Sequence, residues 1–162
     1  MTATARASQP DQTLEKVVFV PPCLLASLER AAQAGDVLWA AKAKLSKIDI
    51  TSRQFVVMHA VSVVPASSQA RLAEVTGVDR STLADMVHLL QVRGLLQRRR
   101  SIYDARAYTV TLTEQGEAVL RIARGVSIQV DDALTAQMTQ GEVDDAWASL
   151  DLMAKASTSA TA

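Results

Sequence analysis

The sequence is poor in cysteine and in aromatic residues. Cys23 is the single cysteine, and Phe, Trp and Tyr together make up 4% of the 162 residues. One cysteine excludes an intrachain disulfide framework and fits a reducing compartment, and the scarcity of aromatic side chains leaves Ala, Leu and Val to build the core. No apolar run approaches the roughly 18 residues that span a bilayer, and the first residues lack the apolar stretch of a secretory signal. These absences predict a soluble cytoplasmic protein.

Motifs of enzymes and of metal sites are missing as well. There are two histidines, His59 and His88, but no glycine-rich phosphate loop and no HExxH or CxxC spacing. Neither histidine has neighbours at ligand spacing. A nucleophilic pair of Cys23 and His59 would have to converge across helices, which no motif supports. We therefore expect no enzymatic activity, no metal and no cofactor.

The formal net charge of zero conceals an uneven distribution. Residues 51–112 contain eight arginines and four acidic residues, whereas the remainder contains nine cations and thirteen acids. Every cation of the middle segment is an arginine, and guanidinium groups suit bidentate contacts with phosphates and base edges. The densest cluster is Arg98-Arg99-Arg100. This pattern indicates an anionic partner for the middle alone, although a solvated charged surface would have the same composition.

Apolar residues recur at helical spacing over the first half of the chain. After Pro21-Pro22, which can open a helix, the pattern predicts one long helix with a bend at Gly35-Asp36. Thr51 is a typical N-cap for a second helix, which Pro65 ends.

Two further helices follow with a tight turn between them. The first is Ser68–Thr76, with Gly77 as its C-terminal stop, and the second is Asp79–Arg93, which Asp79 caps and Gly94 ends. A short helix, a glycine turn and a longer helix have helix-turn-helix spacing. The side chains expected to face inward on the shorter helix are Leu72, Ala73 and Val75.

The hydrophobic period then changes from helical to alternating. Residues 95–100 and 107–112 flank the charged segment SIYDAR, and Tyr108, Val110 and Leu112 alternate at period two. This pattern predicts a β-hairpin with a charged loop. Helix resumes at Thr113, and a last helix is expected to bury one apolar side. The residues of that side are Val143, Trp147, Leu150 and Leu152.

Five stretches in this order carry a resemblance to a known family: ITSRQFVVMHAV, ARLAEVTGVDRSTLADMV, RGLLQRRR, YDARAYTVTLTEQG and AVL. Over roughly residues 50–120 the chain resembles the MarR family of winged helix-turn-helix transcriptional regulators. The flanking helices match that family only in length and pattern.

The resemblance implies a mainly α fold with a small β-hairpin wing, in which a winged helix-turn-helix core is flanked by N- and C-terminal dimerisation helices. In such regulators the flanks intertwine into a homodimer that sets two recognition helices on a pseudo-palindromic operator. The implied segments are an extended or disordered arm (1–20), a dimerisation helix (21–49), the DNA-binding lobe (50–112), C-terminal dimerisation helices (113–156) and a tail (157–162).

By this resemblance the helix Asp79–Arg93 enters the major groove, and the hairpin tip inserts Arg106 into the minor groove, where Asp104 is placed to orient it. The hydroxyls of Ser81 and Thr82 either bind phosphates and base edges or only assist capping. The arginine cluster either lies near phosphates or forms a solvated strand, with Arg99 turned opposite to its neighbours. The expected DNA-contacting residues are Ser68, Gln69, Arg80, Ser81, Thr82, Asp85, Arg98, Arg99, Arg100, Asp104 and Arg106.

Two positions depart from the family pattern, because Asp85 and Leu89 stand where relatives often carry basic residues. A carboxylate at position 85 would accept a hydrogen bond from a cytosine amino group or repel phosphate, or it would pair locally with Arg80 or Arg53. The helix is less cationic than usual in either case, so its affinity is expected to depend more on the wing.

Many regulators of this kind release DNA when a small phenolic or aromatic acid occupies a cleft between the dimerising helices and the winged lobe. Here Trp39 would supply an apolar face and His59 a titratable donor. The alternative is that Met58 and His59 are ordinary core residues. The arrangement looks like that of relatives which control the catabolism of aromatic or heteroaromatic acids. The expected pocket residues are Trp39, Phe55, Met58 and His59.

Two alternative functions stay open. Cys23 lies near the position of the reactive cysteine in peroxide-sensing relatives, and a helix N-terminus can lower the pKa of a thiol, but the tyrosines of those relatives are absent. A winged helix can also bind protein instead of DNA, in which case any DNA affinity would be weak and indifferent to sequence.

Overall fold

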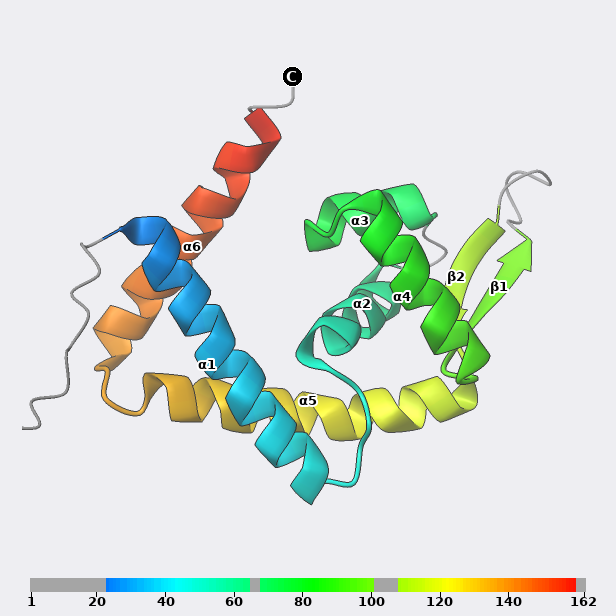
Figure 1. The fold of residues 1–162 in the computed structure, drawn as a ribbon, viewed down its shortest axis with the longest axis horizontal. Coiled ribbons are helices and arrows are strands. Elements are labelled where there is room, and N and C mark those ends of the chain that lie inside the picture. The colour runs from blue at the N-terminus through cyan, green and yellow to red at the C-terminus, as the bar shows by residue number, and fades with distance from the viewer. Residues whose placement is uncertain (1–22, 65–67, 101–107, 160–162) are drawn as a thin grey trace, which may run out of the picture.

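The computed structural model describes residues 23–64, 68–100 and 108–159, which form six helices and one hairpin (Figure 1). The mainly helical fold with a two-stranded wing is therefore as the sequence predicted. The elements are α1 (Leu24–Leu45), α2 (Ser52–Val63), α3 (Gln69–Thr76), α4 (Arg80–Val92), β1 (Leu96–Arg100), β2 (Tyr108–Leu112), α5 (Glu114–Thr135) and α6 (Gln140–Ser159).

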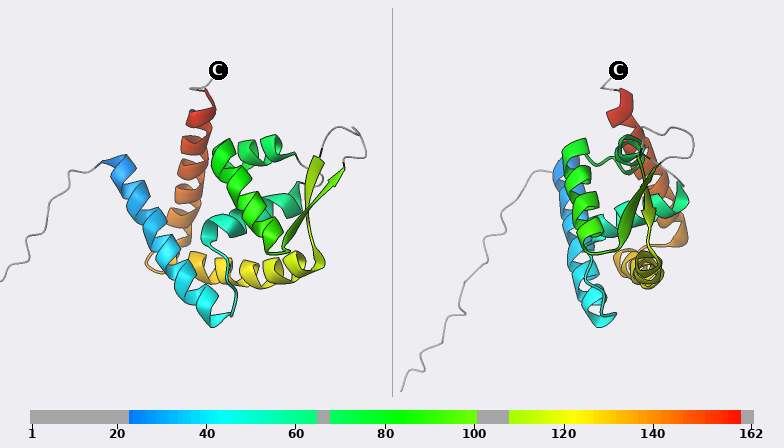
Figure 2. Two further views of the ribbon diagram at one scale, coloured as in Figure 1. Left: turned by 45° about the vertical axis from the view of Figure 1, so that its right-hand side comes forward. Right: turned by 90° about the vertical axis from the view of Figure 1, so that its right-hand side faces the viewer.

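A winged lobe of α2, α3, α4 and the hairpin occupies one side of the molecule, and α5 runs beneath it toward α1 (Figures 1 and 2). α5 packs along α1, and α2 contacts α3, α4 and α5. α6 rises from the end of α5 that is farthest from the hairpin, on the same side of α5 as the lobe (Figure 1). None of the described helices is both long and apolar enough to cross a membrane.

The core of the lobe is built from aliphatic side chains. Val57, Leu72, Leu83 and Leu90 are at most 1% exposed, and each of these buried side chains stabilises the fold by roughly 1.5–3 kcal/mol. Val110 of β2 and Leu120 of α5 close the same cluster. The core therefore joins all elements of the lobe to the start of α5.

Side-chain caps define where the helices begin. Thr51 and Gln54 form a capping box at α2, and the hydroxyls of Ser68 and Thr113 accept backbone N–H groups of α3 and α5. The left-handed φ of Gly77 (67°) ends α3, which allows the sharp turn into α4. These starts and the glycine stop agree with the sequence prediction.

Gly116 is required by the junction between the wing and α5. A Cβ at this position would lie 2.0 Å from the carbonyl oxygen of Leu95. The same junction is held by Thr113, whose N–H donates to the Leu95 carbonyl (3.1 Å) and whose hydroxyl donates to the Gly94 carbonyl (2.6 Å). The Leu-Thr-x-x-Gly segment thus locks β2, the end of α4 and α5 together.

The hairpin pairs antiparallel, with Leu96 opposite Leu112 and Arg100 opposite Tyr108. Strict alternation along β2 was expected, but Tyr108 is exposed while Thr109 and Val110 are both buried. The middle of the strand is buried on both faces, at Thr109 and Val110, whereas its outer end leaves the core at Tyr108. Alternation therefore fails at the outer end of the strand.

α1 is one long helix through Gly35-Asp36, as expected, and α6 continues to Ser159, into the segment 157–162 that was expected to be a tail. One expectation about α3 was wrong. Val75 is exposed, because the eight-residue α3 presents only Leu72 and Ala73 to the core.

The apolar side expected to be buried on α6 is exposed in the single chain. Trp147 is 63% exposed and Leu152 is 69% exposed, because no other element of the described chain covers them. Leu150 is also exposed, and Val143 is half-buried.

Candidate nucleic-acid interface

The first turn of α4 is organised by its N-cap. One carboxylate oxygen of Asp79 accepts the Ser81 hydroxyl (2.6 Å) and the backbone N–H of Thr82 (2.9 Å). The Ser81 and Thr82 hydrogen bonds, with Ser81 the larger contributor, hold the pKa of the Asp79 carboxyl far below its ordinary value. In the unbound chain the Ser81 hydroxyl proton is therefore engaged in capping.

The outward face of α4 is exposed along its length. Arg80, Ser81, Thr82 and Asp85 occupy its first two turns, and none of their side chains is buried. Asp85 forms no ion pair with any residue of the described chain, so the expected local pairing with Arg80 or Arg53 is not found. The Asp85 carboxylate is therefore exposed and has no cationic partner among the described residues.

The three arginines of β1 are all exposed, and none of them forms an ion pair within the described residues. Thr109, opposite Arg99, donates its hydroxyl to the Arg99 carbonyl (3.4 Å). The wing therefore offers three unneutralised guanidinium groups beside the outer end of the hairpin. The other expected wing residues, Asp104 and Arg106, lie outside the described residues.

A small cleft of about 240 Å³ joins the start of α3 to the wing. Its walls are Gln69, Arg98, Tyr108 and Val110. The side-chain nitrogen of Gln69 is buried there without a hydrogen-bond acceptor among the described residues. Buried amide donors are nearly always paired, so this nitrogen is placed to donate to an acceptor that the described residues do not provide.

Ser68 precedes this cleft as the N-cap of α3. Its hydroxyl accepts the backbone N–H of Arg71 (3.2 Å), and the side chain is exposed. The structure thus brings Gln69 and Arg98 together and leaves Ser68 beside them. Tyr108 was not among the sequence-predicted contacts, because a hairpin register that pairs it with Arg100 and faces it toward α3 is not visible in the local pattern.

The C-terminal end of α4 is anchored to the α1–α2 linker, residues 46–51. The guanidinium of Arg93 donates to the backbone carbonyl of Asp49 and lies 3.2 Å from its carboxylate oxygen. At the other side of the linker, Trp39 donates its indole N–H to the Ile50 carbonyl (2.7 Å). The linker is therefore held from both α1 and α4.

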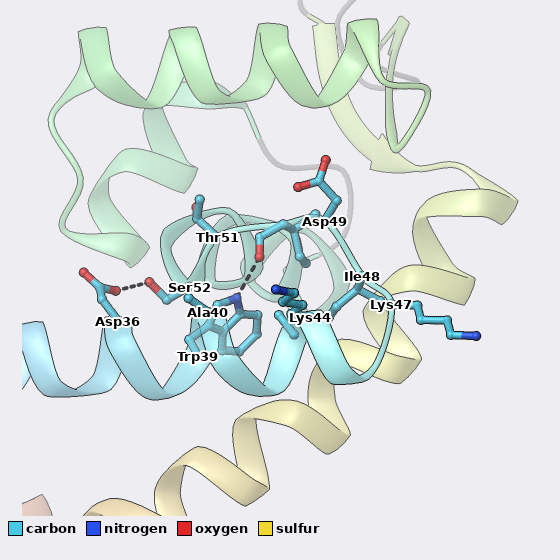
Figure 3. Close-up of a pocket in the computed structure, with 11 residues that line it drawn as sticks. Asp36, Trp39, Ala40, Lys44, Lys47, Ile48, Asp49, Thr51 and Ser52 are labelled. Carbon is cyan, nitrogen blue, oxygen red and sulfur yellow. Dashed lines mark hydrogen bonds between the residues drawn. The ribbon is translucent and has the colours of Figure 1, made fainter.

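A larger cleft of about 560 Å³ lies against this linker (Figure 3). Trp39 forms an apolar wall, Lys44 and Asp36 line the same side from α1, and the Ser52 hydroxyl donates to the Asp36 carboxylate. In Figure 3, Lys47 extends away from the cleft into solvent. The lining residues of α1 recur at helical spacing, which is a signal that could have identified them: Asp36, Trp39, Ala40, Ala43 and Lys44.

The other expected pocket residues lie beside this cleft rather than on its walls. The Phe55 ring lies 4.9 Å from Trp39 and 5.7 Å from His59, centroid to centroid, and His59 is exposed. Met58 is fully buried in the core, so its side chain is not available to a ligand without rearrangement.

A helix-turn-helix followed by a two-stranded antiparallel hairpin is the arrangement of the winged-helix class of proteins. Within that class, residues 48–107 match the model described as the MarR family. HosA of Escherichia coli, a transcriptional regulator, is 33% identical over 94 residues, which cover 58% of this chain and 70% of HosA. The chain belongs to the MarR family of transcriptional regulators.

Solved structures of the same fold include both ligand-responsive and DNA-bound proteins. BpsR of Bordetella bronchiseptica, whose DNA binding is regulated by 6-hydroxynicotinic acid, has a TM-score of 0.74 and 25% identity over 82% of this chain and 93% of BpsR. A variant of MarR from E. coli, in complex with operator DNA, has a TM-score of 0.71 and 26% identity over 80% of this chain and 92% of that protein.

Proposed function

We propose that this protein is a homodimeric repressor that binds double-stranded DNA at an inverted-repeat operator in the cytoplasm and releases it when a small aromatic or phenolic acid binds. The cleft between Gln69, Arg98 and Tyr108 carries the DNA part of this proposal. It presents an amide, a guanidinium and a phenol from three elements, and the amide nitrogen has no acceptor in the part of the chain that the structure describes. A backbone phosphate supplies acceptor oxygens of the size and charge that such donors need.

With a phosphate seated beside α3 and the wing, α4 would lie in the major groove. Arg80, Ser81 and Thr82 would then face phosphates or base edges. The unpaired carboxylate of Asp85 would accept from a cytosine amino group, which would give the helix sequence preference at some cost in affinity. At the wing, Arg99 and Arg100 would approach the backbone, and Arg106, oriented by Asp104, would enter the minor groove.

The exposed apolar residues of the flanking helices support the homodimer. α6 and the end of α5 form a groove of about 490 Å³ with Trp147, Leu150 and Leu134 on its walls. Leu24 and Leu25 of α1 are more than half exposed. Large apolar side chains at this density mark protein interfaces, and a second copy of the chain would cover them in a symmetric assembly.

The cleft at Trp39 supports the effector part of the proposal. An aromatic acid would stack on the Trp39 indole and pair its carboxylate with Lys44. Binding there would disturb the hydrogen bond from Trp39 to the Ile50 carbonyl and shift the linker. The linker is also bonded to the end of α4, where Arg93 donates to the Asp49 carbonyl. The regulation of BpsR by 6-hydroxynicotinic acid makes a heteroaromatic acid a reasonable first effector to test here.

Two alternatives have weaker support. Cys23 is exposed as the N-cap residue of α1, so a redox sensor would require that its alkylation alters DNA binding. A winged-helix module that binds protein would use the same exposed arginines but would select no DNA sequence.

The first test is selection of random duplex DNA by the full-length protein. We expect enrichment of an inverted repeat with half-sites about one helical turn apart. Gln69→Leu, which removes the unpaired donor, should weaken binding to that operator by about tenfold, whereas the control Gln129→Leu on the exposed surface of α5 should leave it unchanged. Binding without any enriched sequence would reject the repressor and favour the protein-binding module.

A further inference from the structure

A fourth hollow, of about 490 Å³, lies between α2, the wing and α5. It shares no lining residue with the Trp39 cleft or with the cleft at Gln69. α2 contributes the end of its buried face, β2 contributes its inner end, and α5 contributes its first three turns. The lining residues are Val61, Ser62, Thr111, Leu112, Glu117, Leu120, Arg121 and Arg124.

Two guanidinium groups from successive turns of α5 face this hollow. Arg124 donates to the Ser62 hydroxyl (2.9 Å), which in turn donates to the His59 carbonyl (2.6 Å), so this arginine is held in place. Neither Arg121 nor Arg124 forms an ion pair within the described chain. Glu117, one turn before Arg121, is the single carboxylate on the lining, which leaves the hollow with a net positive charge.

The hydroxyl of Thr111 adds a second indication. Its oxygen is buried at this lining and has no hydrogen-bond partner among the described residues. Thr109, two residues earlier on the same strand, bonds the Arg99 carbonyl instead. Buried hydroxyls are nearly always paired, so the Thr111 hydroxyl points to a partner that the described residues do not supply.

The remaining surface of the hollow is apolar. Val61 and Leu120 are buried core residues whose side chains form its floor, and Leu112 is half-buried beside them. A bare inorganic anion would use the arginines but leave this apolar surface in contact with water. An organic anion would use both.

We propose that this hollow is a binding site for a small organic carboxylate. Its carboxylate lies between Arg121 and Arg124, its apolar body packs on Val61, Leu112 and Leu120, and the Thr111 hydroxyl completes the hydrogen bonding. Because β2 is a strand of the wing, occupancy ties the wing base to α5 and α2. The site is independent of the DNA and effector proposals, since none of their residues contributes to it.

The experiment is titration of the full-length protein with benzoate, followed by amide NMR and by calorimetry. We expect shifts at Thr111, Leu112 and Arg121. Arg121→Gln should raise the benzoate Kd of this site at least tenfold, and Thr111→Val should raise it severalfold. Arg30→Gln, an exposed arginine on α1, is the matched control and should leave the Kd unchanged. Arg121→Gln removes no bond in the described chain, so it tests the site without loosening α5 from α2.

Three results would overturn the proposal. The first is shifts confined to residues 48–52, which would place benzoate solely at the Trp39 cleft. The second is binding that Arg121→Gln does not change. The third is inorganic phosphate binding as tightly as benzoate at the same amides, because a site selected for an organic carboxylate must gain affinity from its apolar floor.

Discussion

The winged lobe and the flanking helices differ in how completely they bury their own apolar residues. In the lobe, Leu72, Leu83, Val87 and Leu90 are inaccessible to solvent or nearly so, and the core reaches into the wing through Val110. On α6, Leu150, Leu152 and Met153 remain exposed, together with Trp147. The lobe has a closed hydrophobic core, whereas the flanking helices carry exposed apolar side chains that a single chain does not cover.

The largest loss of stability in the lobe is expected when a side chain is introduced at Gly116, where the backbones of α5 and the α4–β1 turn lie closest together. Gly116→Ala places a Cβ 2.0 Å from the Leu95 carbonyl oxygen, so α5 and the turn between α4 and β1, which carries Leu95, must move apart. We expect a loss of about 3 kcal/mol in the free energy of unfolding, measured by urea denaturation. Gly125→Ala is the control, because its Cβ meets nothing within 4 Å, and it should be neutral or slightly stabilising. Equal stability of the two variants would contradict the close contact.

The complementary substitution changes the exposed apolar surface of α6. Trp147→Glu alters a side chain that is 63% exposed, so it should leave the fold of the chain intact but weaken self-association. We expect about 2 kcal/mol, or roughly thirtyfold in the dimer dissociation constant, since buried tryptophans dominate interfaces. Sedimentation equilibrium would measure it, with Glu142→Gln at the exposed start of α6 as the control. A dimer of unchanged strength would mean that another face of the chain mediates assembly.

A smaller effect, on DNA affinity, is expected when one positive charge is removed from the exposed surface of the winged lobe. Arg98→Gln should weaken operator binding about tenfold and reduce the slope of log K against log salt by about 1, because one phosphate contact is lost. Thermal unfolding should be unchanged, since Arg98 is exposed and forms no ion pair in the described chain. An unaltered salt slope would remove Arg98 from the interface.

The smallest effect concerns the cap of α4. The pKa of Asp79 is lowered by hydrogen bonds from Ser81 and Thr82, so the cap contributes stability above the carboxyl's unfolded pKa of about 4 and loses it as the pH falls toward the folded value. Urea denaturation should find Asp79→Ala less stable than the wild type at pH 7, with the difference shrinking below about pH 4. A difference that stays constant across this range would mean that the ionised cap is unimportant.

The same contrast explains which features the sequence could predict. The helix ends of the lobe could be predicted, because they are set by capping residues and a glycine close in sequence. These residues are Thr51, Gly77, Asp79 and Thr113. The order of the elements and the hairpin followed from the change in hydrophobic period. Local signals fix these features because each depends on residues only a few positions apart.

The remaining features depend on distant residues. The cleft at Gln69 needs a wing strand nearly thirty positions away, and the cleft at Trp39 is shaped by a linker whose path follows from long-range hydrogen bonds. The burial of Trp147 was mispredicted because a helical stripe does not reveal whether its own chain will cover it. Periodicity identifies an apolar face, but not the surface that packs on it.

Two side chains hold the linker of residues 46–51 at adjacent backbone carbonyls. Trp39 of α1 donates to the Ile50 carbonyl, and Arg93 at the end of α4 donates to the Asp49 carbonyl. Both contacts are made to main-chain atoms, so most substitutions within the linker would preserve them. A single inserted or deleted residue would shift the backbone, so that Trp39 or Arg93 could no longer donate to its present carbonyl. Homologous sequences should therefore keep the length of this segment constant, and its composition should vary only at the positions other than the buried Ile48 and Ile50 and the α2 cap Thr51.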